Sequence, residues 1–358
     1  MKKRVLYILR YFPTLTETFV YEEIRGLMAR GHSVTIAALG DRADGAANDE
    51  LPEVPVLHVP RRSLRSLGAA SPGRRWLSTV QRAKDAARLP WLARRVGDFD
   101  LVHTHFAGEA AEWARALRRD GGPPYTVTVH ASDLFKPRPA LVPVLQDAGA
   151  VLAVADFHIQ RLAEMGISAT RLRCGPDLSK WTLGPPPVGP LRALFVGRNV
   201  PKKGLDALLD AWPAQGTLDV ISDYEGPVPP GVRVLGPLPP SGVRAAMMRA
   251  NVVVLPCRQA PDGDMDGVPL ALMEGLAAGR PVITTAVSGI PELIDEHVGW
   301  LLPPDDVPAL RAALLAAVQP SERARRGSGG PDRLRARQFT LADQISGLIA
   351  AWSAMTPS

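Results

Sequence analysis

A short turn in the second half of the chain carries three cations between two glycines. Gly197 and Gly204 enclose Arg198, Lys202 and Lys203, after an apolar run and before a helical pattern. A diphosphate needs backbone donors, the positive end of a helix and mobile counter-charges, and this turn offers all three. The turn fits neither the P-loop pattern GxxxxGK[ST] nor the dinucleotide fingerprint GxGxxG. An ordinary polar connection between a strand and a helix remains the alternative interpretation.

Two carboxylates stand at the start of a second helical pattern, with seven residues between them. Asp266 comes just before the predicted helix and Glu274 lies about one and a half turns inside it. The amides of Gly267, Val268 and Leu270 lie at the helix start, where free N–H groups favour anionic or hydroxyl-rich ligands. One carboxylate could therefore reach a sugar ring while the other reaches a ribose.

The acidic residues around this turn do not predict a metal site. Asp262, Asp264 and Asp266 have the spacing of a calcium loop, but the bidentate glutamate that such a loop needs would stand at Met273. A β-strand is predicted upstream, where a calcium loop requires a helix. We expect no metal at this site.

The composition excludes several classes of protein. The 358 residues are 46% apolar and 22% charged, so intrinsic disorder and a fibrous chain are excluded. Two cysteines can form neither a disulfide framework nor a four-cysteine zinc site. The first apolar run is too short for an export signal, and no run of 18 apolar residues predicts a membrane span. We expect a protein of a reducing compartment.

A basic segment, residues 61–95, carries ten Lys or Arg side chains against one acid, Asp85. Apolar residues interleave with these charges, which suits an amphipathic surface against an anionic membrane. A solvated, arginine-rich helical face is the alternative interpretation. We expect no nucleic-acid partner, because neither a zinc-finger spacing nor an aromatic RNA-binding strand accompanies the charge.

Short apolar runs alternate with helical patterns through the first half of the chain, which is typical of parallel strands joined by crossover helices. A helix is predicted over 18–30, where Phe19, Ile24, Leu27 and Met28 share a face. We expect one Rossmann-like α/β domain over residues 1–184, with its strands at 5–9, 33–39, 101–104, 125–129 and 151–154.

The same alternation begins again after a stiff linker rich in proline and glycine, residues 185–190. A second α/β domain is predicted over 191–335 and a final helix within 336–358, with Thr340 as its N-cap and an apolar stripe that packs back on the first domain. Two facing domains would share a cleft at the carboxyl ends of their strands. The predicted strands of the second domain are 191–196, 218–221, 232–235, 251–255 and 282–285.

Taken together, these motifs resemble the retaining glycosyltransferases of family four, which have the two-domain GT-B fold. The first half resembles the exopolysaccharide branch of that family, of the colanic-acid type. The resemblance spans most of the chain with its motifs in order: FPTLTETFVYEEIRGLMARGHSV, HTHFA, TVHASDLF, RCGPDL, GRNVPKKGLDALL, DGVPLALMEGLAAGRPVITTAVSGIPELI and GWLLPP.

The resemblance implies a role for each matching residue. Arg198 and Lys203 would neutralise the diphosphate of a nucleotide-sugar donor, and Glu274 would bind the ribose hydroxyls. Asp266 would hold a hydroxyl of the donor sugar, and His130 would face the reacting sugar from the first domain. The acceptor would enter on the side of the first domain, near Thr14, Thr16, Glu17, His105 and Asp133.

Two departures from the family pattern concern the donor. Asp266 stands where much of the family has glutamate, so the donor sugar is left open. The usual GDGP turn is replaced by residues 222–227, SDYEGP. The implied reaction moves a sugar to a hydroxyl of a polysaccharide, a lipid-linked saccharide or a natural product, with retention and without a metal.

Two other functions fit the same motifs. One is a non-catalytic scaffold that binds a sugar nucleotide within a membrane polysaccharide complex, and the other is a GT-B epimerase or hydrolase that acts on a sugar nucleotide. In every case we expect a cytoplasmic protein, bound peripherally to the inner face of the membrane if the basic segment contacts lipid.

Overall fold

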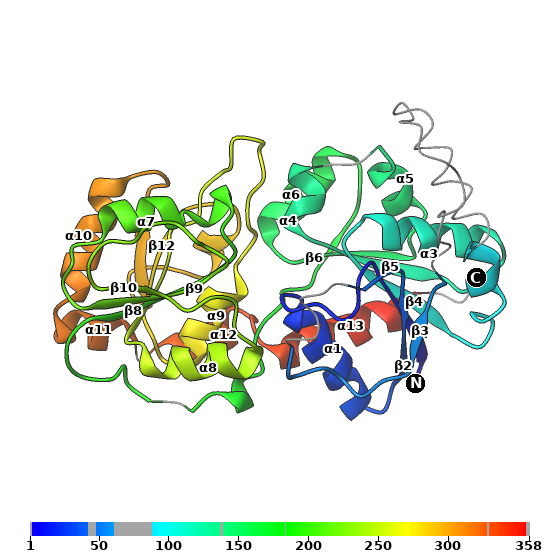
Figure 1. The fold of residues 1–358 in the computed structure, drawn as a ribbon. Helices are drawn as coiled ribbons and strands as arrows, with labels where there is room; N and C mark the ends of the chain where they lie inside the picture. The colour runs from blue at the N-terminus through cyan, green and yellow to red at the C-terminus, as the bar shows by residue number, and fades with distance from the viewer. Residues whose placement is uncertain are drawn as a thin grey trace, which may run out of the picture.

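The computed structural model describes residues 2–41, 48–60, 88–136, 139–182, 184–327 and 329–355. They form two lobes, one from each half of the chain, joined where the chain passes between them (Figure 1). Residues 61–87, which make up most of the basic segment, lie outside the described residues, so the expected membrane surface is not part of this description.

The described part of the first lobe holds a parallel sheet of seven strands in the order β3-β2-β1-β4-β5-β6-β7. Strand β1 shows why the sheet lies at the centre of the lobe, because five of its six residues are buried. Val5 and Tyr7 face one hydrophobic cluster, and Leu6 and Ile8 face the other. The strands are β1 (Arg4–Leu9), β2 (Ser33–Ala38), β3 (Val56–His58), β4 (Leu101–His105), β5 (Tyr125–Val129), β6 (Ala150–Ala153) and β7 (Thr170–Arg171).

Helices cover both faces of this sheet. Helix α1 (Thr18–Ala29) packs on one face through Val20, Ile24 and Leu27, while Met28, expected on the same face, is 37% exposed. Helices α3, α5 and α6 contribute to the cluster on the other face. The helices that follow α1 in this lobe are α3 (Glu109–Arg119), α4 (Ala131–Phe135), α5 (Leu141–Gln146) and α6 (Asp156–Glu164).

The second lobe repeats the plan with a parallel sheet of six described strands in the order β10-β9-β8-β11-β12-β13. Its strands are β8 (Arg192–Val196), β9 (Thr217–Ile221), β10 (Val232–Val234), β11 (Val252–Leu255), β12 (Val282–Thr285) and β13 (Gly299–Leu302). Its helices are α7 (Leu205–Ala211), α8 (Pro240–Arg249), α9 (Leu270–Ala277), α10 (Val307–Ala317), α11 (Pro320–Gly327) and α12 (Gly330–Ala336).

The last helix, α13 (Leu341–Ala354), crosses back and packs beside α1 on the first lobe, as Figure 1 shows. The Thr340 side chain accepts a hydrogen bond from the amide of Asp343 and caps the helix, as expected. Ile345, Leu348 and Trp352 are buried in the cluster that α1 also joins. The predicted architecture of two doubly wound parallel sheets with a returning C-terminal helix is therefore confirmed.

The proline-rich linker is fastened to the second lobe. The side chain of Arg280 donates to the carbonyl of Gly184, that of Asn251 to Pro190 and that of Arg323 to Gly189. These bonds satisfy carbonyls that a chain of prolines cannot pair in a helix or a sheet. The domain bounds expected from composition stay predictions, but this linker moves with the second lobe rather than between the lobes.

Three strands of the structure were not predicted from the sequence. Strand β3 has three residues and β7 has two exposed residues, so neither forms a long apolar run, and β13 has only three apolar residues after its glycine. All three lie at the edges of their sheets. The central strands β5 and β12 have the predicted bounds, because a strand buried on both faces must be apolar throughout.

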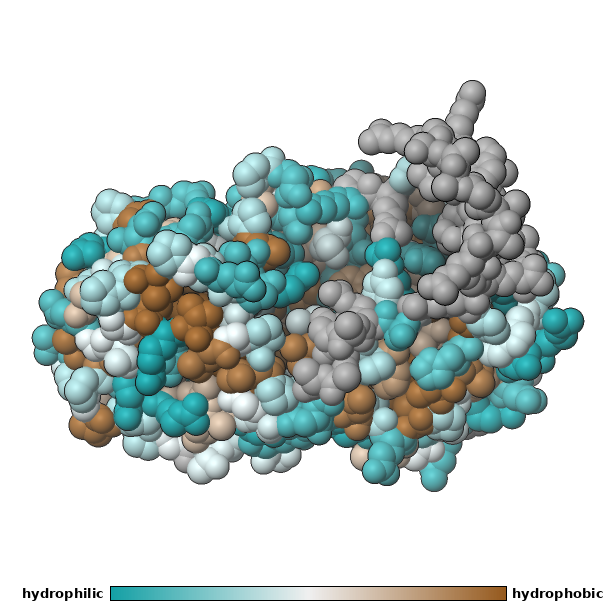
Figure 2. Space-filling view, in the orientation of Figure 1, coloured by the Kyte–Doolittle hydropathy of each residue, from teal (hydrophilic) through white to brown (hydrophobic). Residues whose placement is uncertain are grey.

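No helix within the described ranges has the length and hydropathy that a bilayer span requires. The face shown in Figure 2 is mostly hydrophilic, with hydrophobic residues gathered over the second lobe. Among the described residues, Val188 in the linker is the most exposed large apolar side chain, at 85%.

The chain crosses between the lobes twice at one place, and Gly175 makes this possible. A Cβ atom at Gly175 would lie 2.0 Å from the carbonyl oxygen of Phe339. We expect Gly175→Ala to destabilise the protein by about 1–3 kcal/mol, because the contact is with backbone that cannot rotate away. Urea denaturation measures this loss. Gly97→Ala is the control, since nothing lies within 4 Å of a Cβ there, and equal midpoints for the two variants would contradict the prediction.

Candidate active site

The loops that leave β8 and β11 lie on either side of the point where the strand order of the second sheet reverses. Open α/β sheets bind ligands at such a point, outside the carboxyl ends of the strands. Gly204 brings the two loops together: its φ is +66°, and a Cβ there would lie 2.1 Å from the carbonyl oxygen of Pro256. Only glycine fits this position.

Asp266 and the two lysines of the first loop form a compact ion cluster. Lys203 Nζ lies 2.8 Å from Asp266 Oδ2, and Lys202 Nζ lies 3.4 Å from Asp266 Oδ1 and 3.2 Å from Asp264 Oδ2. Burial alone would raise the pKa of Asp266, but the charges of Lys203 and Lys202 hold it below its usual value. The two loops therefore bring two lysines and a carboxylate together. The lysines can bind an anion, and the carboxylate can accept a hydrogen bond from a hydroxyl.

Arg198 lies at the exposed end of this cluster. The residue after it, Asn199, donates its amide to Asp223 Oδ1 at 2.6 Å, which fixes the loop against the turn that follows β9. Asp223 belongs to the SDYEGP segment that replaces the expected glycine-rich turn. The segment that departs from the family pattern therefore contacts the loop that carries Arg198, Lys202 and Lys203.

Glu274 lies on α9, eight residues after Asp266, and its side chain is partly exposed. Burial raises its pKa to about 8, the charge of Arg244 on α8 opposes the shift, and the carboxylates of Glu22 and Glu50 add to it. The carboxyl group is therefore largely protonated at neutral pH. Ahead of it, Val268 and Leu270 pack on the core of the second lobe, and Gly267 lies against the ring of His158 in the first lobe.

His130 follows β5 in the first lobe and caps α4. Its amide donates to Asp133 Oδ2 at 2.8 Å, and its ring packs against Phe106 and Phe19. Burial, together with the nearby charges of His105 and His158, lowers the pKa of His130 well below its usual value. A neutral imidazole at the rim of the cleft can donate or accept a hydrogen bond without carrying charge.

Some of the residues expected on the acceptor side are exposed and others are buried. Thr16 is exposed and Glu17 half-buried, just before α1, whereas Thr14 is buried and bonded to Tyr21. His105, also expected on the acceptor side, is only 3% exposed. Its ring lies behind His130 and contacts that ring and a buried carboxylate, so it does not line the cleft.

Several polar contacts join the two lobes around these residues. Glu292 in the second lobe accepts hydrogen bonds from the amides that begin α6 and pairs with Arg173 at 2.9 Å. Lys136 at the end of α4 pairs with Asp262 at 2.6 Å, and Arg244 on α8 pairs with Glu50. These side chains of the two lobes therefore meet directly across their junction.

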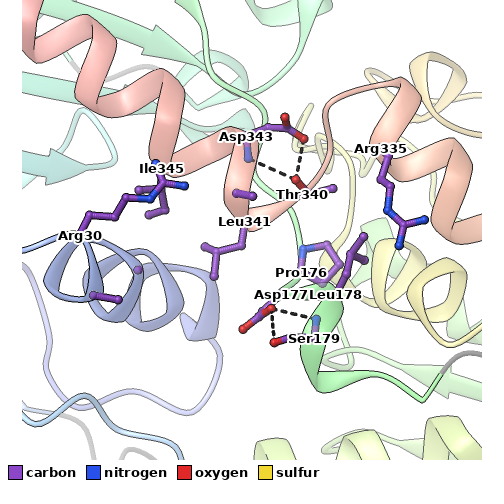
Figure 3. A pocket seen from close by; sticks show the side chains of 13 residues that line it. Arg30, Pro176, Asp177, Leu178, Ser179, Arg335, Thr340, Leu341, Asp343 and Ile345 are labelled. Atoms are coloured by element: carbon purple, nitrogen blue, oxygen red, sulfur yellow. Dashed lines mark hydrogen bonds between the residues drawn. The ribbon is translucent and has the colours of Figure 1, made fainter.

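Two cavities lie near the junction of the lobes. One, of about 530 Å³, is lined by the basic loop and by Lys136, Asp262 and Asp264, and this volume suits a small-molecule ligand. The other, of about 630 Å³, lies at the crossover between α1 and the start of α13 (Figure 3). Its lining includes Asp177 and Thr340 but none of the expected site residues. Of the expected site residues, Arg198 lines the first cavity and none lines the second, so the first cavity is the better candidate for a ligand.

Two protein-family models match the chain one after the other. The model described as "Glycosyltransferase Family 4" matches residues 16–177, and the model described as "Glycosyl transferases group 1" matches residues 190–319. The chain belongs to glycosyltransferase family 4. The first match covers the lobe with His130, and the second covers the lobe with the ion cluster.

Similar sequences to this family-4 chain occur in bacteria. The amylovoran biosynthesis glycosyltransferase AmsK of Erwinia amylovora is 33% identical over 252 residues, which span 62% of this chain and 61% of the relative. The putative colanic acid biosynthesis glycosyltransferase WcaL of Escherichia coli is 29% identical, spanning 88% of this chain and 91% of the relative.

Solved structures share the fold at lower identity. Sucrose-phosphate synthase of Thermosynechococcus elongatus superposes with a TM-score of 0.75 at 19% identity, covering 99% of this chain and 100% of that one. Anabaena HepE in complex with UDP-glucose gives a TM-score of 0.76 at 14% identity, covering 98% and 100%. The family-4 chain thus has the GT-B arrangement of two facing lobes.

Sequence reasoning passed over Glu23, Lys136 and Arg244. Glu23 had a visible signal, since it stands between Val20 and Leu27 on the apolar face of α1, where a charged side chain is rarely buried without a partner. Lys136 and Arg244 had none, because their partners are remote in sequence and lie on the opposite lobe.

The raised pKa of Glu274 predicts a pH-dependent stability. Between about pH 4.5 and pH 8 the folded protein holds a proton on Glu274 that the unfolded chain has released, so stability falls as pH rises across this window. Glu274→Gln has no group that titrates at this position, so it does not lose stability in this way. We expect the melting temperature of the variant, relative to the natural protein, to increase from pH 5 to pH 8 and to level off above pH 8.

Thermal unfolding of both proteins across that pH range measures the effect. Glu296→Gln is the matched control, because Glu296 is in the same lobe with its side chain 76% exposed. A difference for Glu274→Gln that is constant with pH would show that the carboxyl group titrates as it does in the unfolded chain.

Proposed function

We propose that the protein transfers a sugar from a nucleoside-diphosphate sugar to a hydroxyl acceptor, with retention of configuration at the anomeric carbon. The observation that carries the proposal is the ion cluster of Lys202 and Lys203 with Asp266, on the same loop as Arg198 and at the strand ends where such folds bind ligands. Membership of family 4 and the GT-B fold support it.

Arg198 and Lys203 bind the diphosphate and stabilise it as it leaves. Negative charge develops on the departing phosphate oxygen, and fixed cations in a cleft with little water stabilise such charge strongly. Lys203 is held by Asp266 before the donor binds. When the diphosphate takes over this lysine, Asp266 is free to accept a hydrogen bond from a hydroxyl of the donor sugar.

Glu274 binds the ribose of the nucleotide. Its side chain is partly exposed on α9, and the amides of Gly267, Val268 and Leu270 lie between it and Asp266. A protonated carboxyl group can both donate to one ribose hydroxyl and accept from the other. The raised pKa of Glu274 supports this two-way hydrogen bonding.

Both His130 and the donor phosphate act at the anomeric carbon. The bond from the anomeric carbon to the phosphate oxygen breaks, and the acceptor oxygen forms its bond on the same face. The acceptor proton passes to the departing phosphate oxygen, so no protein carboxylate is needed as a nucleophile. His130 faces the sugar from the first lobe and orients it with a neutral ring.

The acceptor is a saccharide, a lipid-linked saccharide or a small molecule, and it enters past Thr16, Glu17 and Asp133. The names of the relatives AmsK and WcaL place those proteins in polysaccharide biosynthesis, which supports the first two classes. The basic residues of 61–95 would bring the protein to an anionic membrane from the cytoplasmic side. No nucleic acid takes part.

Loss of either binding group should reduce turnover. We expect Lys203→Ala and Glu274→Ala each to lower turnover at least about tenfold, equivalent to about 1.4 kcal/mol of transition-state stabilisation. The measurement is release of nucleoside diphosphate from UDP-, GDP-, ADP- and CDP-sugars, with and without a saccharide acceptor.

The matched control for these variants is Arg233→Ala. It removes a cation of the same lobe whose side chain is 64% exposed and pairs with Asp219 at the sheet edge. Near-normal rates in both Lys203→Ala and Glu274→Ala would refute the assignment. Nucleotide release that does not depend on the acceptor would indicate a hydrolase or an epimerase.

Turnover should also persist in EDTA. Arg198, Lys202 and Lys203 supply the positive charge that a divalent cation provides in other phosphoryl-binding sites. We expect equal rates with EDTA and with added magnesium or manganese. A loss of at least tenfold in EDTA, restored by either metal, would show that a cation belongs to the site.

A further inference from the structure

A chain of four hydrogen-bonded side chains runs from the C-terminal helix to His130. Gln344 on α13 donates to Glu23 Oε2 at 2.6 Å. Glu23 Oε1 lies 2.9 Å from Nε2 of His105, and Nδ1 of His105 lies 3.1 Å from Nε2 of His130. Glu23 and His105 are buried at 0% and 3% exposure, while His130 is partly exposed to the cleft.

Glu23 is costly to bury, and its surroundings hold it as a carboxylate. Burial alone would raise its pKa, but the charges and hydrogen bonds of His105, with His103 and Tyr7, lower it to about 2. Tyr7 donates to Glu23 Oε1 at 2.6 Å. Packing alone would be served as well by an apolar residue, because Val20, Ile24 and Leu27 already bury this face of α1.

We propose that Glu23 is a positioning residue for His130 and acts on it through His105. The inference rests on the proposed function, in which His130 faces the reacting sugar. A carboxylate can only accept, so Glu23 fixes an N–H on Nε2 of His105. That fixes the orientation of the His105 ring, whose other nitrogen bonds His130 and holds its ring in one orientation and one tautomer.

Some of the same side chains could instead bind a metal ion. Glu23, His103 and His105 offer ligand atoms that all lie within 4.8 Å of one another. Both oxygens of Glu23 already accept hydrogen bonds, from Tyr7, His105 and Gln344. The arrangement is thus complete as a hydrogen-bond network, and a metal at this place is an outcome that the experiment can reveal.

Charged and titratable groups reach the two ends of this network from several elements. Tyr7 on β1 and His103 on β4 face Glu23, as does Cys174 after β7. His158 on α6 and Asp133 on α4 flank His130. Among them Glu23 favours the protonated form of His130, while burial, His105, His158 and His103 oppose it.

The test compares Glu23→Gln with His103→Asn. Glu23→Gln keeps the shape and removes the charge, whereas His103→Asn changes a buried group that lies 3.7 Å from Glu23 and bonds Thr126 but is not a member of the hydrogen-bonded chain to His130. We expect Glu23→Gln to lower kcat at least tenfold with less than a threefold change in the donor KM. The acidic limb of kcat should move to lower pH, because the charge that favours protonated imidazole is gone.

A double variant separates positioning from stability. In Glu23→Gln with Gln344→Glu the hydrogen-bonded pair is restored, but the charge lies one side chain further from His105. We expect this variant to regain the thermal stability that Glu23→Gln loses while its kcat stays low and its acidic limb stays shifted. Recovery of kcat together with stability would overturn the proposal, as would an unchanged kcat in Glu23→Gln.

Histidine-selective ¹⁵N NMR measures the tautomers of the histidine rings without requiring any turnover. We expect the ring nitrogens of His130 to report one tautomer in the natural protein and in His103→Asn, and a mixture in Glu23→Gln. An unchanged His130 signal in Glu23→Gln would refute positioning even if the protein transfers sugars. Absence of transfer with an altered His130 signal would refute the proposed function alone. Zinc-dependent shifts of the His103 and His105 signals would replace the network with a metal site.

Discussion

The cleft depends on one carboxylate, Glu292, which binds the opposite lobe at three points. Its oxygens accept from the amides of Asp156 and Phe157 at 3.0 and 3.1 Å, where the positive end of α6 favours an anion, and from Arg173 at 2.9 Å. Arg173 is itself 9% exposed and bonds the carbonyl of Arg337 at the second chain crossing. Glu292 thus joins the start of α6, Arg173 and, through Arg173, the second chain crossing.

Two acidic groups of the cleft are paired or neutralised before a ligand arrives. Asp266 neutralises Lys203, and the proton on Glu274 removes a charge that Glu22 and Glu50 would repel. An anionic ligand therefore exchanges one partner of Lys203 for another instead of filling a charged vacancy, which favours selectivity over raw affinity. In the proposed reaction, the carboxylate released in this exchange accepts a hydrogen bond from a hydroxyl of the donor sugar.

The sequence predicts what is local and leaves out what is remote. Buried parallel strands such as β5 are continuous apolar runs, and the loops after β8 and β11 follow from the fold. By contrast, β7 has two exposed residues and no pattern. Glu23 and Gln344 are 321 residues apart, and only the docking of α13 on α1 brings them together. Family resemblance located His130 and His105 but not Glu23 and Gln344 behind them.

The two chain crossings have a mechanical consequence. Gly175 and Phe339 are in backbone contact, and the proline-rich linker is fastened to the second lobe. Because the two backbones already touch at this place, neither crossing can shift toward the other without a clash. A change in the angle between the lobes therefore has to pivot close to this contact.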